Sequence, residues 1–125
     1  MRSIIYQLTG VHILLVDDDP DILTLFTYVL QQAGVVLTVV QDGISAREAL
    51  QKATYDLLLT DYQLPGMCGD ALCRHAHKYG TRRTVLMSCS PQLRQLAHDC
   101  RADGTYQKGQ PLHELLGLLT NLVVA

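Results

Sequence analysis

Acidic side chains directly follow two short apolar runs of the sequence. Asp17, Asp18 and Asp19 come after the run HILLV, and Asp61 comes after the run LLLT. Carboxylates gathered in one place repel and raise one another's pKa values, unless a cation and a lysine neutralise them. Mg²⁺ fits such a group, because it prefers oxygen ligands and is commonly bound by one or two carboxylates together with a phosphate. The residue types therefore indicate a magnesium-dependent site.

Two further polar side chains follow later apolar runs. Ser88 comes after the run TVLM, and Lys108 comes after the run TYQ. A carboxylate, Mg²⁺, an ammonium group and a hydroxyl together suit phosphoryl transfer, in which the carboxylate attacks phosphorus and the cations offset the charge on the phosphoryl oxygens. The product would be an acyl phosphate on an aspartate. Asp19, which precedes Pro20, is also a good helix N-cap, whereas Asp17 and Asp18 have no such role.

Short apolar runs alternate with segments whose apolar residues recur at helical spacing. The predicted strands lie at residues 12–16, 35–40, 57–60, 84–87 and 105–107. The predicted helices lie at residues 21–33, 43–53, 68–80 and 93–100 and from about residue 111 to the end of the chain. Continuous apolar strands that alternate with amphipathic helices indicate an α/β protein with a parallel sheet covered on both faces. Right-handed crossovers then predict a doubly wound sheet of five strands in the order 2-1-3-4-5.

This topology would bring the polar residues together. In open parallel sheets the ligand site lies beyond the carboxyl ends of the strands, so Asp17, Asp18, Asp61, Ser88 and Lys108 should share one edge. The length of 125 residues is that of a single domain. Residues 1–10 precede the repeating pattern and are interpreted as an N-terminal arm, with the domain itself at 11–125.

Composition excludes several classes of protein. Hydrophobic residues make up 48% of the chain and charged residues 18%, which excludes a disordered segment. The net charge of −2 and the scattered basic residues argue against direct nucleic-acid binding. The four cysteines lack metal-site spacing and favour a reducing compartment. The sequence has no apolar run of membrane-spanning length and no signal-type core, so we expect a cytoplasmic protein without membrane insertion.

Four segments of the chain resemble the receiver domain of two-component response regulators, in particular single-domain regulators of the chemotaxis type. These segments are HILLVDDDPDIL, LLLTDYQLPGMCG, VLMSCS and ADGTYQK. Each motif alone is weak, but their order and spacing together are specific, and the resemblance extends from residue 12 to about residue 123. It implies a flavodoxin-like fold with five helices on both faces of the sheet, and a function as a Mg²⁺-dependent phosphoacceptor.

The resemblance also implies roles for the acidic residues. Asp61 would be the phosphoacceptor and would also contact the metal. Asp18 would bind Mg²⁺ directly with Asp17 assisting, and the backbone carbonyl of Gln63 would supply another ligand.

The remaining roles concern the phosphoryl group and its lifetime. The resemblance implies that Ser88 is the switch hydroxyl and that Lys108 binds the phosphate. Gln63 and Ser90 occupy positions that tune hydrolysis of the acyl phosphate in this family. Phosphorylation and dephosphorylation would be self-catalysed, and no separate metabolic reaction is expected.

The resemblance further implies the partners of a phosphorelay. The phosphoryl donor would be a sensor histidine kinase or a histidine phosphotransfer protein, and small phosphodonors could substitute. A downstream protein would bind the face formed by the fourth helix, the fifth strand and the fifth helix, whose affinity changes on phosphorylation. The chain would act either as a stand-alone regulator or as a receiver taken from a larger protein.

The sequence departs from the family pattern at three positions. The family usually has an aromatic switch residue three positions before the lysine. The resemblance therefore assigns the switch position to Thr105, which is not aromatic, with Tyr106 one place later. The family lysine is usually followed by proline in a cis peptide, whereas Lys108 is followed by Gly109, so this loop should take another path. Cys68 stands where an acidic residue is frequent, and we expect little consequence.

Two alternative functions remain open from the sequence. A pseudo-receiver that only binds partners would fit the altered loop after Lys108. The D-x-D pattern of Asp17 and Asp19 also resembles haloacid-dehalogenase-type phosphatases, but Pro20 follows it and Asp61 would then have no role. Cys89, next to the switch serine, is interpreted as a buried structural thiol.

Overall fold

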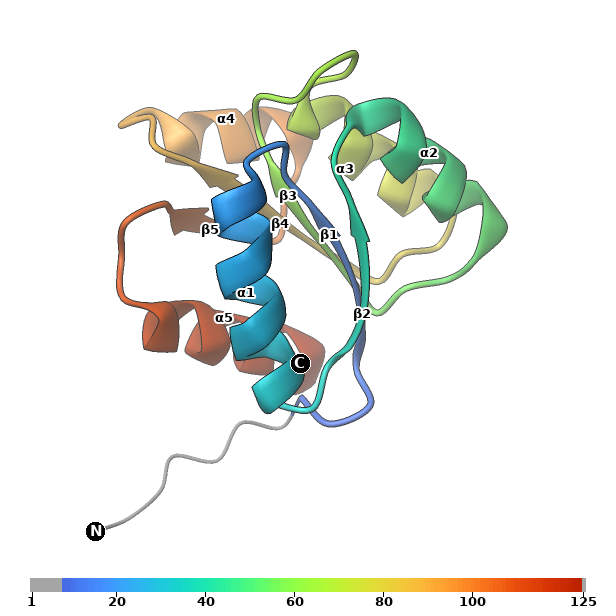
Figure 1. Cartoon of the computed structure of the whole chain (residues 1–125). Coiled ribbons are helices and arrows are strands. Elements are labelled where there is room, and N and C mark those ends of the chain that lie inside the picture. Colours follow the sequence, from blue (N-terminus) through green and yellow to red (C-terminus); the bar gives the residue numbers. More distant parts are fainter. Residues whose placement is uncertain (1–7, 125) are drawn as a thin grey trace, which may run out of the picture.

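The computed structural model describes residues 8–124, which form five strands and five helices in strict alternation (Figure 1). The strands are β1 (His12–Val16), β2 (Val36–Val40), β3 (Leu57–Asp61), β4 (Arg83–Ser88) and β5 (Gly104–Gln107). The helices are α1 (Pro20–Gln32), α2 (Gly43–Lys52), α3 (Gly69–Lys78), α4 (Leu93–Cys100) and α5 (Leu112–Val124). Within residues 8–124, no helix has both the length and the apolar character needed to cross a bilayer.

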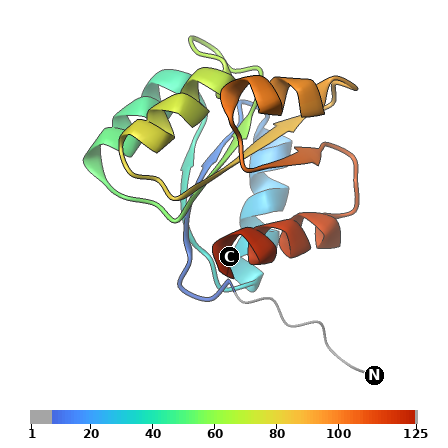
Figure 2. The same cartoon turned by 180° about the vertical axis from the view of Figure 1, so that it is seen from behind.

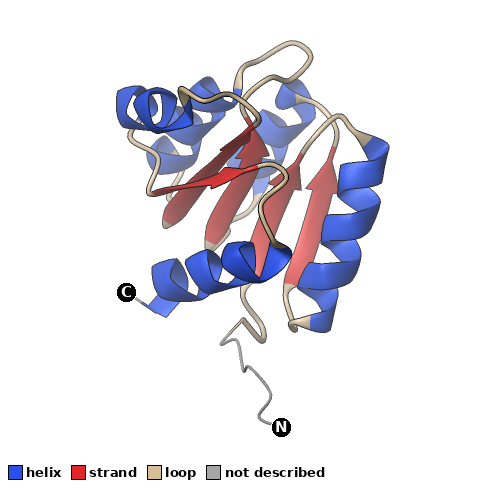
Figure 3. Ribbon diagram, turned by 90° about the vertical axis from the view of Figure 1, so that its left-hand side faces the viewer, coloured by secondary structure: helices blue, strands red, loops and turns tan. Residues whose placement is uncertain are grey.

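The strands form one parallel sheet in the order β2-β1-β3-β4-β5, which confirms the predicted topology. Helices α1 and α5 cover one face of the sheet, and α2, α3 and α4 cover the other, as the view from behind shows (Figure 2). The ribbon in Figure 3 shows the strands enclosed between these helices. Crossovers on both faces are what a doubly wound sheet requires.

Each face of the sheet has its own core, and alternation along the central strands supplies both. In β1, Leu15 packs beneath α1 and α5, whereas its neighbour Leu14 packs beneath α2 and α3. In β3, Leu59 and Leu58 divide in the same way, and all four leucines are fully buried. Strands buried on both faces must be apolar at every position, which is why they appear in the sequence as continuous runs.

Helix α1 begins one residue before the predicted range, directly after the predicted N-cap Asp19. Asp19 caps it by accepting a hydrogen bond from the backbone N–H of Asp21 at 2.9 Å, and Pro20 occupies the first helical turn. Gly34 follows the helix with φ of +90°, and a Cβ there would lie 2.9 Å from the Cα of Thr9. Only glycine combines this conformation with so close an approach.

Residues 1–7 of the predicted arm lie outside the described residues. Leu8 is fully buried and belongs to the core beneath α1 and α5. The N–H of Gly10 donates to the carbonyl of Gly34 at 2.9 Å, which joins this segment to the end of α1. The division of the chain at residue 10 stays a prediction.

Two strands are longer than the sequence pattern predicted, in a way that matters for the site. Asp61 is the last residue of β3 and Ser88 the last residue of β4, where the prediction placed both just after the strands. Their backbones are therefore paired in the sheet, Asp61 opposite Met87 in the register of β3 and β4. The strand geometry fixes where these two side chains begin.

Candidate functional site

The predicted polar residues meet at the carboxyl edge of the sheet. Asp17 and Asp18 follow β1, and Asp61 ends the neighbouring strand β3. Ser88 ends β4, and Lys108 follows β5. Because all five strands run in the same direction, their ends place these side chains on one side of the molecule.

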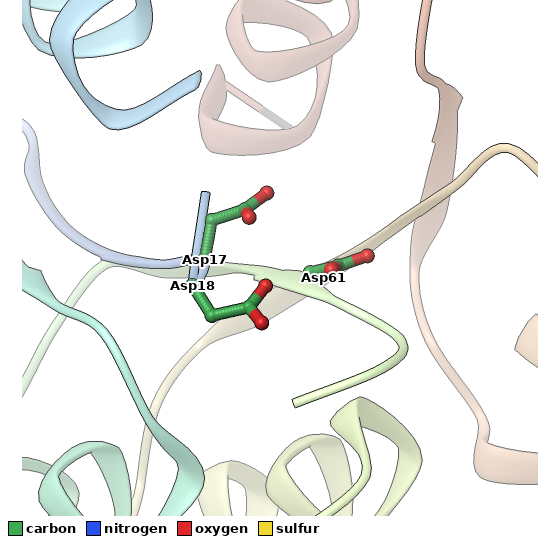
Figure 4. Close-up of side chains that lie close together, drawn as sticks. All are labelled: Asp17, Asp18 and Asp61. Carbon is green, nitrogen blue, oxygen red and sulfur yellow. The ribbon is translucent and has the colours of Figure 1, made fainter. Parts of the chain in front are cut away.

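Three carboxylates form the centre of this edge. One oxygen from each of Asp17, Asp18 and Asp61 lies within 4.8 Å of the other two. Figure 4 shows the two side chains that follow β1 beside the one that ends β3. Asp17 is fully buried and Asp61 is 8% exposed, whereas Asp18 is open to solvent. Such a group of hard oxygen donors, accessible from one side, could hold a divalent cation.

The ammonium group of Lys108 lies against the two buried carboxylates. Its Nζ is 2.8 Å from Oδ2 of Asp17 and 3.3 Å from Oδ2 of Asp61. Burial alone would lower the pKa of Lys108, but the hydrogen bonds and charges of Asp17 and Asp61 outweigh it and raise this pKa above its ordinary value. Lys108 is therefore protonated at neutral pH, and its ammonium group bridges the ends of β1 and β3.

The surroundings of Asp61 shift its pKa in opposite directions. Burial raises its pKa above the ordinary value for aspartate, and the negative charge of Asp17 acts in the same direction. The charge of Lys108 and its hydrogen bond with Asp61 act against this rise without cancelling it. An ionised Asp61 is thus incompletely neutralised by the protein, which is the condition under which a further cation is stabilising.

Asp17 also organises the turn that follows β1. Its Oδ1 accepts a hydrogen bond from the backbone N–H of Asp19 at 2.9 Å, while its Oδ2 faces Lys108. The N–H of Asp17 donates to the carbonyl of Val40 in the edge strand β2 at 3.3 Å. The exposed carboxylate of Asp18 is therefore presented by a turn that Asp17 and Asp19 hold in place.

A cleft of about 560 Å³ opens beside Asp61. Its wall includes Gln63, Ser88, Ser90 and Lys108, so the residues predicted for the switch and for lifetime control share it, apart from Thr105. The Oγ of Ser88 accepts a hydrogen bond from the backbone N–H of Ser90 at 3.0 Å. The cleft is large enough for a phosphoryl group, and a carboxylate, a hydroxyl and an ammonium group converge on it.

The loop after β3 folds back tightly behind Asp61. The N–H of Tyr62 donates to the carbonyl of Met87 at 2.8 Å, and the N–H of Gly69 donates to the carbonyl of Tyr62 at 2.6 Å. A Cβ at Gly69 would lie 2.2 Å from the backbone oxygen of Asp61. Sequence reasoning missed the role of Gly69, although its place at the predicted start of a helix was a signal for close packing.

Three positions differ from the expectations or add to them. The expectation that Cys89 is buried was wrong: its thiol is exposed and lines the cleft, because β4 ends at Ser88 and the chain leaves the sheet there. Thr105 is half-buried in β5, opposite Leu86. Tyr106 points instead into the core beneath α1, where its ring packs edge-on against Phe26 with 6.1 Å between centroids.

Two similar curated proteins are longer chains, and each matches about half of this one. The DNA-binding response regulator MtrA of Mycolicibacterium smegmatis is 44% identical over 62 residues, which are 50% of this chain and 27% of MtrA. The transcription factor SKN7 of Saccharomyces cerevisiae is 42% identical over 60 residues, which are 48% of this chain and 10% of SKN7. The aligned part is thus about a quarter or less of either relative.

Solved structures share the fold over nearly the whole chain. The chemotaxis response regulator CheY4 of Vibrio cholerae superposes with a TM-score of 0.81 at 26% identity, covering 91% of this chain and 99% of CheY4. The receiver domain of the sensor histidine kinase PA1611 from Pseudomonas aeruginosa, which has a magnesium ion in its active site cleft, superposes with a TM-score of 0.84 at 24% identity, covering 94% and 100% of the two chains. The sequence model of the response regulator receiver domain matches residues 13–120. The chain therefore belongs to the receiver domain family of two-component response regulators.

Proposed function

We propose that this receiver domain accepts a phosphoryl group on Asp61 from a phosphohistidine of a partner protein, in a reaction that depends on Mg²⁺. The observation that carries the proposal is the position of Asp61, which lines an open cleft with Lys108 at 3.3 Å and two further carboxylates within 4.8 Å. Receiver domains as a family interact with histidine kinases and with downstream effectors.

The donor set fits the metal. Asp17, Asp18 and Asp61 supply carboxylate oxygens, and the backbone carbonyl of Gln63 lies in the loop directly after β3. The related receiver domain of PA1611 contains magnesium in its cleft, which supports the same ion here. When bound, Mg²⁺ would offset negative charge on the carboxylates and on the incoming phosphoryl oxygens.

In the transfer step, a carboxylate oxygen of Asp61 attacks the phosphorus of an N-phosphorylated imidazole. The P–N bond breaks, the imidazole leaves with the bonding electron pair and takes up a proton, and an acyl phosphate forms on Asp61. Lys108, which pairs with the free carboxylate, can then pair with a phosphoryl oxygen. The hydroxyl of Ser88 in the same cleft can donate to another phosphoryl oxygen.

The chemical change would reach partners through the segment after β4. When Ser88 turns toward the phosphoryl group, its hydrogen bond with the N–H of Ser90 has to change, and the start of α4 follows. We assign partner switching to the face made by α4, β5 and α5. Gln63 and Ser90 line the same cleft as Asp61, which supports a role for both in the lifetime of the acyl phosphate.

The phosphatase alternative conflicts with the geometry. Its nucleophile and its acid/base would be Asp17 and Asp19, but Asp17 is fully buried against Lys108, and Oδ1 of Asp19 is engaged in capping α1. Asp61 and not Asp17 lines the cleft.

The test is the intact mass of the protein after incubation with MgCl₂ and acetyl phosphate. We expect the wild-type protein to gain one phosphoryl group, and expect no gain with a chelator or in Asp61→Asn. Asp99→Asn, which removes an exposed carboxylate of α4, is the matched control and should behave as the wild type. If the wild-type protein gains nothing from acetyl phosphate or from a phosphohistidine donor, the phosphoacceptor function is refuted and a pure binding module remains.

A further inference from the structure

The loop after Lys108 is a four-residue turn in this chain. The N–H of Gln110 donates to the carbonyl of Gln107 at 3.1 Å, which closes a turn with Lys108 and Gly109 at its centre. Gly109 has φ of +98°, as the third residue of a type II turn requires. In receiver domains this lysine is usually followed by proline, whose ring restricts the backbone. Here it is followed by Gly109, whose backbone can adopt many conformations.

Two side-chain contacts hold this turn in place. The hydroxyl of Tyr106 donates to the backbone carbonyl of Gln110, and the N–H of Gln107 donates to Oε1 of Gln110 at 3.1 Å. Gln110 is therefore bound at three of its polar groups. On the other side, the N–H of Lys108 donates to the carbonyl of Ser88 at 3.0 Å.

Tyr106 is well suited to be a fixed donor. The residue is 3% exposed, and its ring packs edge-on against Phe26 in the core beneath α1. Burial, and secondarily the charge of Glu114, raise the pKa of its hydroxyl, so the donor stays protonated. A buried tyrosine hydroxyl needs a partner, and the carbonyl of Gln110 is the one that this geometry supplies.

We propose that Tyr106 and Gln110 form a tether that positions Lys108 for the phosphoryl group, in place of the proline that usually follows this lysine. The inference rests on the proposed phosphoacceptor function and assigns Tyr106 as a positioning residue for it. The ammonium group reaches Asp17 and Asp61 from the first central position of the turn, so the placement of Nζ depends on the backbone that the tether fixes.

The experiment compares Tyr106→Phe with the wild-type protein in the rate of phosphorylation by acetyl phosphate. The variant keeps the ring against Phe26 and removes only the hydroxyl. Loss of one buried hydrogen bond should slow the rate roughly fivefold. Affinity for Mg²⁺, measured by calorimetric titration with MgCl₂, should not fall, because Tyr106 touches none of the three site carboxylates and a less firmly placed Lys108 competes less with the cation for them. Tyr55→Phe, at another buried tyrosine, is the matched control and should keep the wild-type rate.

A double-mutant cycle separates positioning from a general structural effect. If Tyr106 acts through Lys108, then Tyr106→Phe should have no further effect on the rate in a Lys108→Ala background. Backbone amide exchange of Gly109 and Gln110 should quicken in Tyr106→Phe, whatever phosphodonor is present.

Two results overturn the tether: an unchanged rate in Tyr106→Phe, or an equal slowing in the wild-type and Lys108→Ala backgrounds. A wild-type protein that gains no phosphoryl group is a different result. It refutes the phosphoacceptor function and this inference with it.

Discussion

Burial of Asp61 disfavours its ionised form, yet the proposed reaction requires the ionised carboxylate as the nucleophile. Among the charged residues that the structure describes around Asp61, only Lys108 favours its ionisation, and Lys108 is shared with Asp17. Without a metal ion, the negative charge of Asp17 and Asp61 therefore exceeds the positive charge that Lys108 supplies. A carboxylate whose charge is only partly compensated interacts strongly with a divalent cation and can attack the electrophilic phosphorus of a phosphoryl donor.

This imbalance predicts that Asp61→Asn stabilises the metal-free protein. Because the folded-state pKa of Asp61 lies above its unfolded value, stability falls as the pH rises from the unfolded-state pKa to beyond the folded-state pKa. At about pH 7 the variant should therefore unfold at a higher temperature than the metal-free wild-type protein. Thermal unfolding in the presence of a chelator measures the difference.

The pH dependence supplies the control. At a pH below the ordinary pKa of aspartate, the Asp61 carboxyl is neutral in both the folded and the unfolded protein. The gain in stability from Asp61→Asn should therefore vanish at about pH 3. Saturating MgCl₂ should remove the gain at neutral pH or reverse its sign. A variant that is less stable than the metal-free wild type at neutral pH would show that Lys108 neutralises Asp61 more completely than we infer.

At the scale of elements, the site depends on strands that end at the right residue and loops that fold back at once. Asp61 is held from behind by α3, whose first residue, Gly69, touches the backbone of Asp61. The packing of a helix start against a strand end therefore decides the position of the nucleophile.

Gly69→Ala is expected to disturb both stability and phosphorylation. The added Cβ would meet the Asp61 oxygen at 2.2 Å and the Tyr62 Cα at 2.9 Å, which are backbone atoms that cannot rotate away. We expect a loss of about 2 kcal/mol in the free energy of unfolding by urea, and slower phosphorylation. Gly117→Ala in α5 is the matched control, since a Cβ there meets nothing within 4 Å and should raise stability slightly. Equal stabilities of the two variants would contradict the close packing at Gly69.

The elements themselves could be predicted, because burial on both faces makes each central strand a continuous apolar run. Their boundaries were less certain: Asp61 and Ser88 proved to be strand residues, since polar side chains at a strand end look the same in sequence as the start of a loop. The burial of Cys89 was predicted wrongly, because that prediction followed the general tendency of free cysteine to be buried, whereas the chain leaves the sheet after Ser88 and exposes the thiol. The contact of Tyr106 with the Gln110 carbonyl had no sequence signal, because it depends on where a backbone atom lies in the folded chain.

At the scale of the whole molecule, the site is connected to some helices more directly than to others. Asp17 and Asp18 are joined to α1 through a capped turn, whereas Ser88 and Lys108 lead directly into the segments before α4 and α5. The N–H of Lys108 donates to the carbonyl of Ser88, so the ends of β4 and β5 move together. A change at the phosphoryl group should therefore reach α4, β5 and α5 before it reaches α2.

This asymmetry predicts where amide exchange changes on phosphorylation. With MgCl₂ and acetyl phosphate, exchange in residues 89–92 and 105–110 should slow about tenfold, as a coupling of about 1.4 kcal/mol would give. Exchange in α2 should be unaffected, and Asp61→Asn should show no change in any of these segments. Hydrogen–deuterium exchange read by mass spectrometry measures all three segments at once. Slowing that is equal in α2 and in residues 105–110 would indicate a general stabilisation of the fold, and would contradict a directed signal through β4 and β5.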